Sequence, residues 1–276
     1  MKYILLFISA LALAQAPALT KTDQLQDAAR KGDAAAVKKL LDEGVDVNTR
    51  FRYNATALFY ACDHGHVEAV KVLLDRGADM AVKDTFYGFT PLMLAMGPAQ
   101  KKKPEHAEIA KLLIAKGAPG QDAALSMAIQ GNDLPMATYI LEQGKVPAAN
   151  LSDALEAAKA QNKTHAVALL EKAGAKPYDE FKLDAAQLAK MAGTYKNAAG
   201  IEFTVVVNGQ RLSVGQATAP AGQRLTLIAK DATTFRVIGT GGQPGSAAFT
   251  IENDKATALT LTIGPQNIVM TRVEGK

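Results

Sequence analysis

The sequence has very few of the residues that form metal sites and covalent cross-links. Its 276 residues include one Cys, four His and no Trp. A single Cys excludes an internal disulfide and any cysteine-based metal cage. Hydrophobic residues make up 48% of the chain, which is too large a share for a disordered protein. We therefore expect a folded protein that holds no metal and no cofactor.

Neither sign of charge dominates the sequence. The chain has 31 Lys and Arg against 27 Asp and Glu, which gives a net charge of +4. This charge is too small and too mixed in sign to favour a nucleic-acid-binding protein. The length suits one or two domains.

Long apolar runs are also missing, and the one notable run is at the N-terminus. Residues 3–13 are uncharged and apolar, Lys2 precedes them, and small residues follow at Ala12 and Ala14. This pattern is typical of a secretory signal peptide, and it is shorter than the roughly 20 residues that span a bilayer. We predict a signal peptide at residues 1–14, with cleavage after Ala18 as the alternative. A buried N-terminal helix is the competing interpretation. Export predicts a periplasmic or secreted bacterial protein.

One short sequence motif recurs through residues 21–176. Two apolar residues are followed by two or three others and then by Gly, and successive copies are 33, 40, 27 and 30 residues apart. A period near 33 is typical of stacked helix pairs. The copies end at Gly44, Gly77, Gly117, Gly144 and Gly174.

Local signals agree with two short helices in each unit. Thr56 suits an N-cap, and Pro91 follows Thr90 at a position where a missing N–H costs little. The turn between the two helices needs a residue that tolerates left-handed backbone. The residues expected to take this conformation are Gly32, Gly65, Gly131 and Asn162.

Residues 54–84 read NATALFYACDHGHVEAVKVLLDRGADMAVKD and resemble the ankyrin repeat. The units at 21–49 and 87–119 resemble it clearly, whereas the units in residues 120–176 are eroded. The Thr-Pro-Leu-His motif of the family is nowhere intact, because Phe59 and Met93 replace its His and residues 120–176 lack it. The resemblance implies a solenoid of about five ankyrin repeats over residues 21–176. It also implies that the concave face binds a protein partner.

The sequence pattern changes after this region. Residues 177–192 should form a linker with one short helix that begins near Asp184. From residue 193 to 276 the helical period is lost, β-branched residues alternate, and Asn208-Gly209 gives a strong hairpin signal. About eight short strands predict a small antiparallel β-barrel or sandwich. We take the barrel, so the fold class is a multidomain α+β protein.

The order of features in residues 193–276 resembles the small lipocalin-like domain at the C-terminus of many bacterial serine β-lactamase-related hydrolases. The matching residues are Gly193-Thr-Tyr195, the hairpin at 208–212, Phe235, Phe249 and Thr271-Arg272-Val273. In those hydrolases the domain is an accessory, so the resemblance implies no catalytic residues here. The chain has no Ser-x-x-Lys phrase either. We expect no enzyme activity.

Aromatic residues are concentrated in one part of the chain. Seven of the 16 Phe and Tyr residues lie within residues 51–89, and the segments 50–53 and 84–87 should lie on successive hairpins. Aromatic and Arg side chains are frequent at binding hot spots. The alternative is that the rings stack on each other only for stability. The predicted partner-binding residues are Phe51, Arg52, Tyr53, Tyr60, Asp63, Phe86 and Tyr87.

We expect the histidines and the single cysteine to have structural roles. His64 and His66 lie at an ankyrin turn, where such residues bond to the backbone, and His106 and His165 should occupy comparable positions. Cys62 should be a buried, inert thiol.

The function predicted from these features is an exported ankyrin-repeat binding or scaffold protein without catalysis. It would hold a protein partner on its concave face, while the barrel covers the end of the stack. The alternative is that the barrel binds a small apolar ligand.

Overall fold

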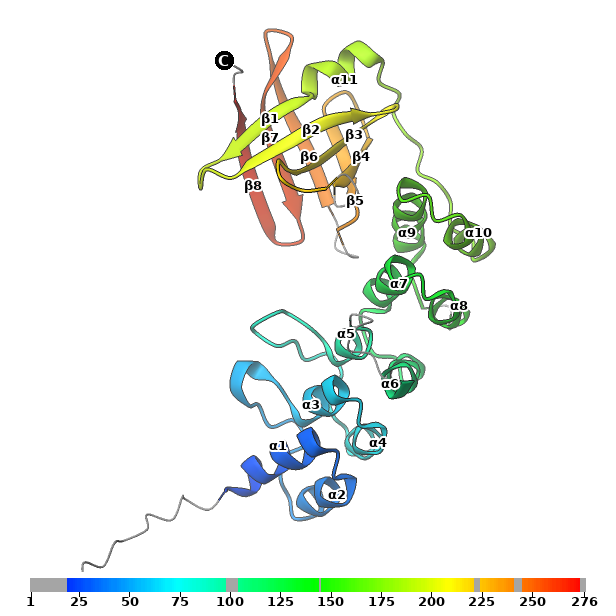
Figure 1. The fold of residues 1–276 in the computed structure, drawn as a ribbon, viewed down its shortest axis with the longest axis vertical. Coiled ribbons are helices and arrows are strands. Elements are labelled where there is room, and N and C mark those ends of the chain that lie inside the picture. Colours follow the sequence, from blue (N-terminus) through cyan, green and yellow to red (C-terminus); the bar gives the residue numbers. More distant parts are fainter. Residues whose placement is uncertain (1–18, 98–103, 144, 221–223, 241–244, 274–276) are drawn as a thin grey trace, which may run out of the picture.

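A computed structural model describes residues 19–97, 104–143, 145–220, 224–240 and 245–273. Within these residues a row of helix pairs leads into a closed β-barrel (Figure 1). The predicted signal peptide, residues 1–14 or up to 18, lies outside the described residues.

The described residues of the N-terminal part form five helix pairs. The first helices line one side of the row and the second helices line the other (Figure 1). The pairs are α1 Lys21–Lys31 with α2 Ala34–Asp42, α3 Ala57–His64 with α4 Val67–Asp75, α5 Pro91–Ala95 with α6 Pro104–Ala115, α7 Gln121–Gln130 with α8 Leu134–Glu142, and α9 Ala148–Ala160 with α10 Thr164–Lys172.

The predicted helix starts are confirmed. The Thr56 hydroxyl accepts a hydrogen bond from the Phe59 N–H, and the Thr90 hydroxyl accepts one from the Met93 N–H. Each threonine thus satisfies one of the donors that the first helical turn leaves free. The predicted helix ends hold as well, with φ between 79° and 89° at Gly44, Gly77, Gly117 and Gly174. Gly144 is outside the described residues.

The turns inside the pairs follow the prediction with one correction. Gly32, Gly65 and Asn162 have positive φ, as expected. Gly131 does not, because its φ is −76°, and Asn132 with φ 56° is the left-handed residue instead. The turn is displaced by one residue because Asn tolerates this conformation, which leaves Gly131 in right-handed helical geometry.

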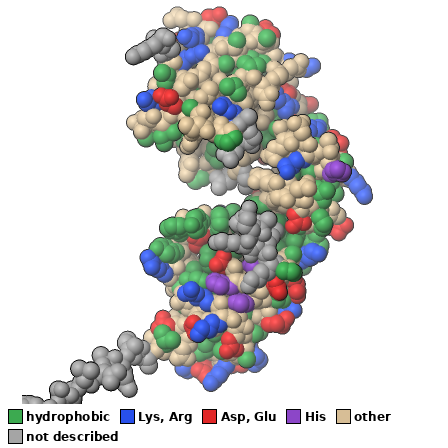
Figure 2. All heavy atoms as spheres, viewed as in Figure 1, with side chains coloured by type: hydrophobic (Ala, Val, Ile, Leu, Met, Phe, Trp, Pro, Cys, Tyr) green, Lys and Arg blue, Asp and Glu red, His purple; other side chains and the backbone are tan. Residues whose placement is uncertain are grey.

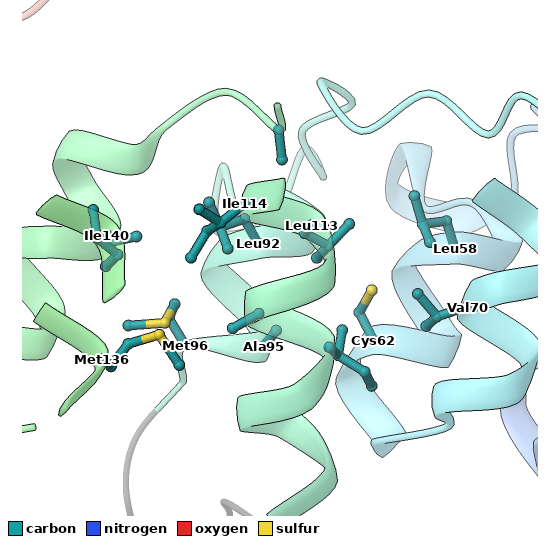
Figure 3. Close-up of a cluster of buried hydrophobic side chains, with 14 of the residues drawn as sticks. Leu58, Cys62, Val70, Leu92, Ala95, Met96, Leu113, Ile114, Met136 and Ile140 are labelled. Carbon is teal, nitrogen blue, oxygen red and sulfur yellow. The ribbon is translucent and has the colours of Figure 1, made fainter. Parts of the chain in front are cut away.

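The core of the stack is a continuous seam between neighbouring pairs. Figure 3 shows Leu58 and Cys62 of α3 near Leu113 of α6, and all three side chains are fully buried. Ala61 and Ala95 are also fully buried, so that the first helices approach closely. Stability of the stack thus depends on contacts between adjacent units.

The C-terminal part is a closed barrel in which each strand pairs antiparallel with the next and β1 pairs with β8. This confirms the expected eight strands. They are β1 Gly193–Asn197, β2 Glu202–Asn208, β3 Arg211–Gln216, β4 Leu225–Ala229, β5 Thr234–Ile238, β6 Gly245–Glu252, β7 Lys255–Ile263 and β8 Gln266–Arg272.

The hairpin between β2 and β3 is shifted by one residue from the predicted Asn208-Gly209 turn. Asn208 pairs with Arg211, so the two-residue loop is Gly209-Gln210. Gly209 has φ 62°, and Gln210 is not among the residues with positive φ. A loop with left-handed backbone at its first position needs Gly there, whereas Asn208 can remain in the strand.

Side chains of the barrel itself fill its interior. The Phe235 and Phe249 rings meet edge to face at 5.4 Å between centroids, and the Tyr195 ring lies 6.0 Å from Phe249. The short helix α11, Ala185–Met191, begins at a capping box on Asp184 and adds Leu188 and Met191 to the same core.

The two ends of the barrel sequence meet beside α11. Arg272 of β8 donates to the carbonyl oxygens of Lys190 and Ala192, and thereby caps the C-terminal end of α11. Gly193 leaves room for this side chain, because a Cβ there would lie 2.9 Å from the Arg272 Nη2. Gly193 and Arg272, at opposite ends of the barrel sequence, therefore lie next to each other in the fold.

The barrel is attached to the stack through α9. Arg211 of β3 donates to Glu156 of α9 over 2.7 Å and to Glu180 of the linker over 2.9 Å. Glu156 is only 1% exposed, so the ion pair lies inside the junction. Ile238, on the outer face of β5, is 2% exposed although it is not part of the barrel core.

The linker strengthens this junction. The Tyr178 hydroxyl donates to Asp153 of α9 over 2.7 Å, and the Arg236 guanidinium lies 4.0 Å from the centre of the Tyr178 ring. Burial raises the pKa of Asp153, while the Tyr178 hydroxyl and Arg236 act in the opposite direction. The linker N–H of Phe181 donates to Ala229 of β4.

Candidate functional site

A shallow hollow of about 280 Å³ lies between the loop at residues 51–55 and the loop at residues 84–89. Its lining is mainly aromatic and includes five of the seven residues predicted from the sequence. The lining residues are Arg52, Tyr53, Ala55, Phe59, Tyr60, Asp84, Phe86 and Tyr87.

The other two predicted residues lie outside this lining. Phe51 packs beside the hollow, with its ring 6.0 Å from that of Tyr60. Asp63 is near the C-terminal end of α3, where its carboxylate is 3.6 Å from the His64 Nδ1. The structure therefore brings Phe51 to the edge of the hollow and leaves Asp63 apart from it.

Asp84 positions the second loop, and the sequence prediction did not include it. Asp84 is 4% exposed, and its carboxylate accepts hydrogen bonds from the backbone N–H groups of Phe86, Tyr87 and Phe89 over 2.6–2.8 Å. An Asp side chain that bonds the next backbone groups is a common turn former. Asp84 directly before the aromatic run was the available signal.

The two loops hold each other in place. The Thr85 N–H donates to the Tyr53 carbonyl over 2.9 Å, and the Asn54 side-chain amide donates to the Lys83 carbonyl over 2.8 Å. Tyr53 and Asn54 have φ of 58° and 60°, which is left-handed backbone outside glycine. The paired loops over-determine this conformation.

The aromatic rings contact each other and remain exposed. Tyr53 and Phe86, from different loops, have ring centroids 5.4 Å apart, and Phe86 meets Tyr87 edge to face at 4.5 Å. Tyr53 is nevertheless 46% exposed, Phe86 62% and Tyr87 70%. Stacking for stability and an exposed apolar patch are therefore both present.

Cationic side chains border the hollow. The Arg52 guanidinium lies 4.5 Å from the centre of the Tyr53 ring, and the Arg30 guanidinium lies 5.6 Å from that of Tyr60. The Gln26 amide donates to the Tyr60 hydroxyl. Among its described residues, the lining contains two charged side chains, Arg52 and Asp84, and three backbone N–H groups already occupy the Asp84 carboxylate.

The hollow faces a wider opening of the molecule. The two loops project from the stack on the side where the barrel stands (Figure 1), and the space-filling view shows a gap between the barrel and the first repeats (Figure 2). Hydrophobic side chains gather on the lip of this gap that belongs to the stack (Figure 2).

The sequence model for ankyrin repeats matches residues 25–122 in three copies. These residues are ankyrin repeats. The hollow lies within them, between the second and third pairs, and the two weaker units recognised from the sequence follow the matched segment as α7–α10. A search of curated proteins finds no match for this chain.

The histidines of the ankyrin turns bond to the backbone, as predicted for three of them. His64 Nδ1 donates to the Tyr60 carbonyl, His66 Nε2 to Arg30 and His106 Nε2 to Asp63. Among the described residues, no group of three or more His, Cys, Asp or Glu is arranged to hold a metal ion.

The prediction for His165 is wrong. His165 lies inside α10 and is exposed, and the position equivalent to His66 is Lys163, whose Nζ donates to the Gln130 carbonyl over 3.2 Å. The left-handed residue of this turn, Asn162, directly precedes Lys163, just as Gly65 precedes His66. The contact between repeats is thus kept with a different side chain.

Cys62 is fully buried in α3, as expected. Burial raises the pKa of its thiol well above the ordinary value. The thiolate is the reactive form of Cys, so this side chain serves packing.

Proposed function

We propose that this protein is an ankyrin-repeat binding or scaffold protein, and that it holds a protein partner on the concave face of its stack. The observation that carries the proposal is the exposed aromatic hollow on the second and third repeats. Phe86 and Tyr87 are 62% and 70% exposed on a fixed loop, and Arg52 lies beside them.

The size and chemistry of the hollow support a protein partner. Small-molecule pockets are usually about 300–1,000 Å³ and largely enclosed, whereas this hollow is shallow and about 280 Å³. It suits one or two side chains from a larger surface. Rings and Arg held in place before binding lose little freedom when a partner covers them.

The test uses two sets of variants in the full chain. Phe86→Ala with Tyr87→Ala removes the exposed rings, and Tyr139→Ala removes a Tyr from α8, away from the hollow. We expect cross-linking in cell-envelope extract to capture a partner with the wild type and the Tyr139 variant. Capture by the double variant should fall at least tenfold, with unchanged circular dichroism. An unchanged partner list would contradict the proposal.

The alternative, a small apolar ligand inside the barrel, has less support. Tyr195, Phe235 and Phe249 occupy the interior and are at most 5% exposed. Native mass spectrometry of the purified protein tests this alternative, because a retained small molecule would favour it.

The proposal includes the absence of catalysis. Among the described residues, no cluster of three or more His, Cys, Asp or Glu side chains could hold a metal ion, and the sequence has no Ser-x-x-Lys motif. A broad panel of hydrolase substrates provides the test, and clear turnover by the purified wild type would overturn this part.

We also propose export to the periplasm or the exterior of a bacterial cell, on the basis of residues 1–14. None of the helices in the described part of the chain is long and apolar enough to cross a membrane. N-terminal sequencing of the protein from the periplasmic fraction should start at Gln15, or at Leu19 after the alternative cleavage. A cytoplasmic protein that retains Lys2 would contradict export.

A further inference from the structure

A second hollow lies at the junction of the two domains, apart from the aromatic hollow. It has a volume of about 430 Å³, and its walls come from α9, the turn before α10, and the strands β2–β5 with the segments beside them. Its polar lining includes Gln161, Lys163, Asn208, Ser213, Arg224 and Thr226.

The charge of this junction groove is positive. Among the residues that the structure describes, its lining contains Lys163 and Arg224 and no Asp or Glu. Lys163 Nζ donates to the Gln130 carbonyl over 3.2 Å, and Arg224 Nη1 donates to the Thr204 carbonyl over 3.0 Å. Within the described ranges, neither cation has a carboxylate within ion-pair distance. Both therefore keep donors and net charge for a further partner.

The other cations at the junction are different. Arg211 is paired with Glu156 and Glu180, and Arg236 lies 4.0 Å from Asp153. Carboxylates therefore neutralise the arginines that join the two domains, whereas the positive charges of Lys163 and Arg224 remain inside the groove.

Ser213 adds a hydroxyl group to the lining of the groove. It projects from the outer face of β3, is 7% exposed and lines the groove. Its neighbours along the strand, Leu212 and Val214, point into the barrel core. The Ser213 hydroxyl can donate a hydrogen bond to an anion bound in the groove.

We propose that the junction groove binds a small polar molecule that carries a phosphate or carboxylate group. Lys and Arg supply charged donors, and charge-assisted hydrogen bonds to oxyanions are stronger than neutral ones. Ser213 and Thr226 add hydroxyl donors, and the amides of Gln161 and Asn208 can bond the polar body of the ligand. The volume exceeds that of a bare inorganic ion, so the anionic group would be part of a larger molecule.

Binding in this groove would hold the barrel on the stack, because each domain supplies one wall. A ligand that binds the docked arrangement stabilises it by mass action.

The test measures binding of inorganic phosphate, pyrophosphate and citrate to the full chain by calorimetry. Sodium chloride at matched, low ionic strength is the reference, since salt screens exposed charges. We expect saturable binding of at least one of these anions, and the comparison of pyrophosphate with citrate separates the phosphate from the carboxylate source. The same anion should raise the thermal midpoint and slow proteolysis of the linker.

Variants then assign the binding to the groove. Lys163→Gln and Arg224→Gln should each weaken binding about tenfold, because each removes a charged donor, and the double variant should show none. Lys163→Arg keeps the charge and should bind within about threefold of the wild type. Lys172→Gln, at the C-terminal end of α10 and outside the groove, should leave binding unchanged.

The proposal is overturned if no anion binds more tightly than chloride, or if the folded double variant binds as the wild type does. It is also overturned if a folded Lys163→Arg variant loses binding as fully as Lys163→Gln. None of these outcomes depends on the aromatic hollow, so partner capture and anion binding can fail separately.

Discussion

The two domains use their aromatic residues in opposite ways. In the barrel, Tyr195, Phe235 and Phe249 are inside and at most 5% exposed. In the ankyrin stack, Phe86 and Tyr87 are on a loop and more than 60% exposed.

This difference in the exposure of aromatic side chains arises because the β-sheet closes into a barrel and the ankyrin stack does not. The pairing of β1 with β8 leaves the barrel without a free edge, and its inward side chains must fill one enclosed space. A stack of helix pairs contacts only neighbouring pairs, so one face remains open along its length. The open domain has a surface for a partner, whereas the closed domain uses its large side chains for its own stability.

The largest expected effect is on the free energy of unfolding, in a comparison of one phenylalanine from each domain. Phe235→Ala leaves a cavity in the barrel and should lower the free energy of unfolding of that domain by about 3–5 kcal/mol. Phe86→Ala removes an exposed ring and should cost less than about 1 kcal/mol. Urea unfolding followed by far-UV circular dichroism checks both. Equal losses would show that the hollow belongs to the core of the stack.

The junction gives the next largest effect. Arg211→Met leaves Glu156, which is 1% exposed, without its ion-pair partner, and loss of one member of a buried pair costs about 3 kcal/mol. We expect faster proteolysis of the linker at residues 177–183 and a lower thermal midpoint.

The control for the junction is Lys196→Met. Lys196 pairs with Glu202 over 3.8 Å, and both side chains are about half exposed. Exposed pairs of this kind contribute less than about 1 kcal/mol. A linker that is cut equally fast in both variants would contradict a role for Arg211 in docking the barrel.

A smaller difference in stability is expected between substitutions at two glycines of the stack. Gly65 and Gly77 both have φ near 79°, but a Cβ at Gly65 would lie 2.9 Å from the His106 ring, whereas a Cβ at Gly77 meets nothing within 4 Å. Either change to Ala costs about 1–2 kcal/mol for the left-handed backbone. Gly65→Ala should cost more in thermal unfolding, because it also displaces the His106 contact between repeats.

The smallest effect is a pH dependence in the barrel. Hydrogen bonds from the Thr234 hydroxyl and from the Thr233 and Thr234 N–H groups lower the pKa of Asp231 from 3.8 to about 2. A lowered pKa in the folded state stabilises the protein above pH 3.8, and this contribution is lost as the pH falls toward 2. An NMR titration of the Asp231 carboxyl carbon should have its midpoint near pH 2. A midpoint near 3.8 would contradict these hydrogen bonds.

Much of the fold could be predicted, and the errors are instructive. The Gly spacing, the Thr caps and the strand alternation are local signals, and the structure agrees with them. The two turn errors, at Gly131 and at Asn208, are shifts of a single residue. In each case Asn and Gly are near each other and both suit a turn, so only the hydrogen-bond register chooses between them.

Part of the candidate site could also be predicted from local sequence signals. The concentration of aromatic residues in the sequence predicted Tyr53, Phe86 and Tyr87 as site residues, because the loops that carry them occupy the same place in successive repeats. Asp63 was also predicted, yet it lies outside the lining of the hollow. Which face of a helix end meets the next loop depends on packing between repeats, and helical periodicity does not specify it.

The sequence by itself determined the helix pairs, their turns, the number of strands and the concentration of aromatic residues near residues 51–89. Each of these depends on residues that are close together in the chain. The tertiary structure decided the closure of the barrel, the burial of Glu156 against Arg211 and the positive groove between the domains. Arg211 and Glu156 are 55 residues apart. Their pairing needs two separately folded surfaces to meet, and the local pattern of neither segment carries that information.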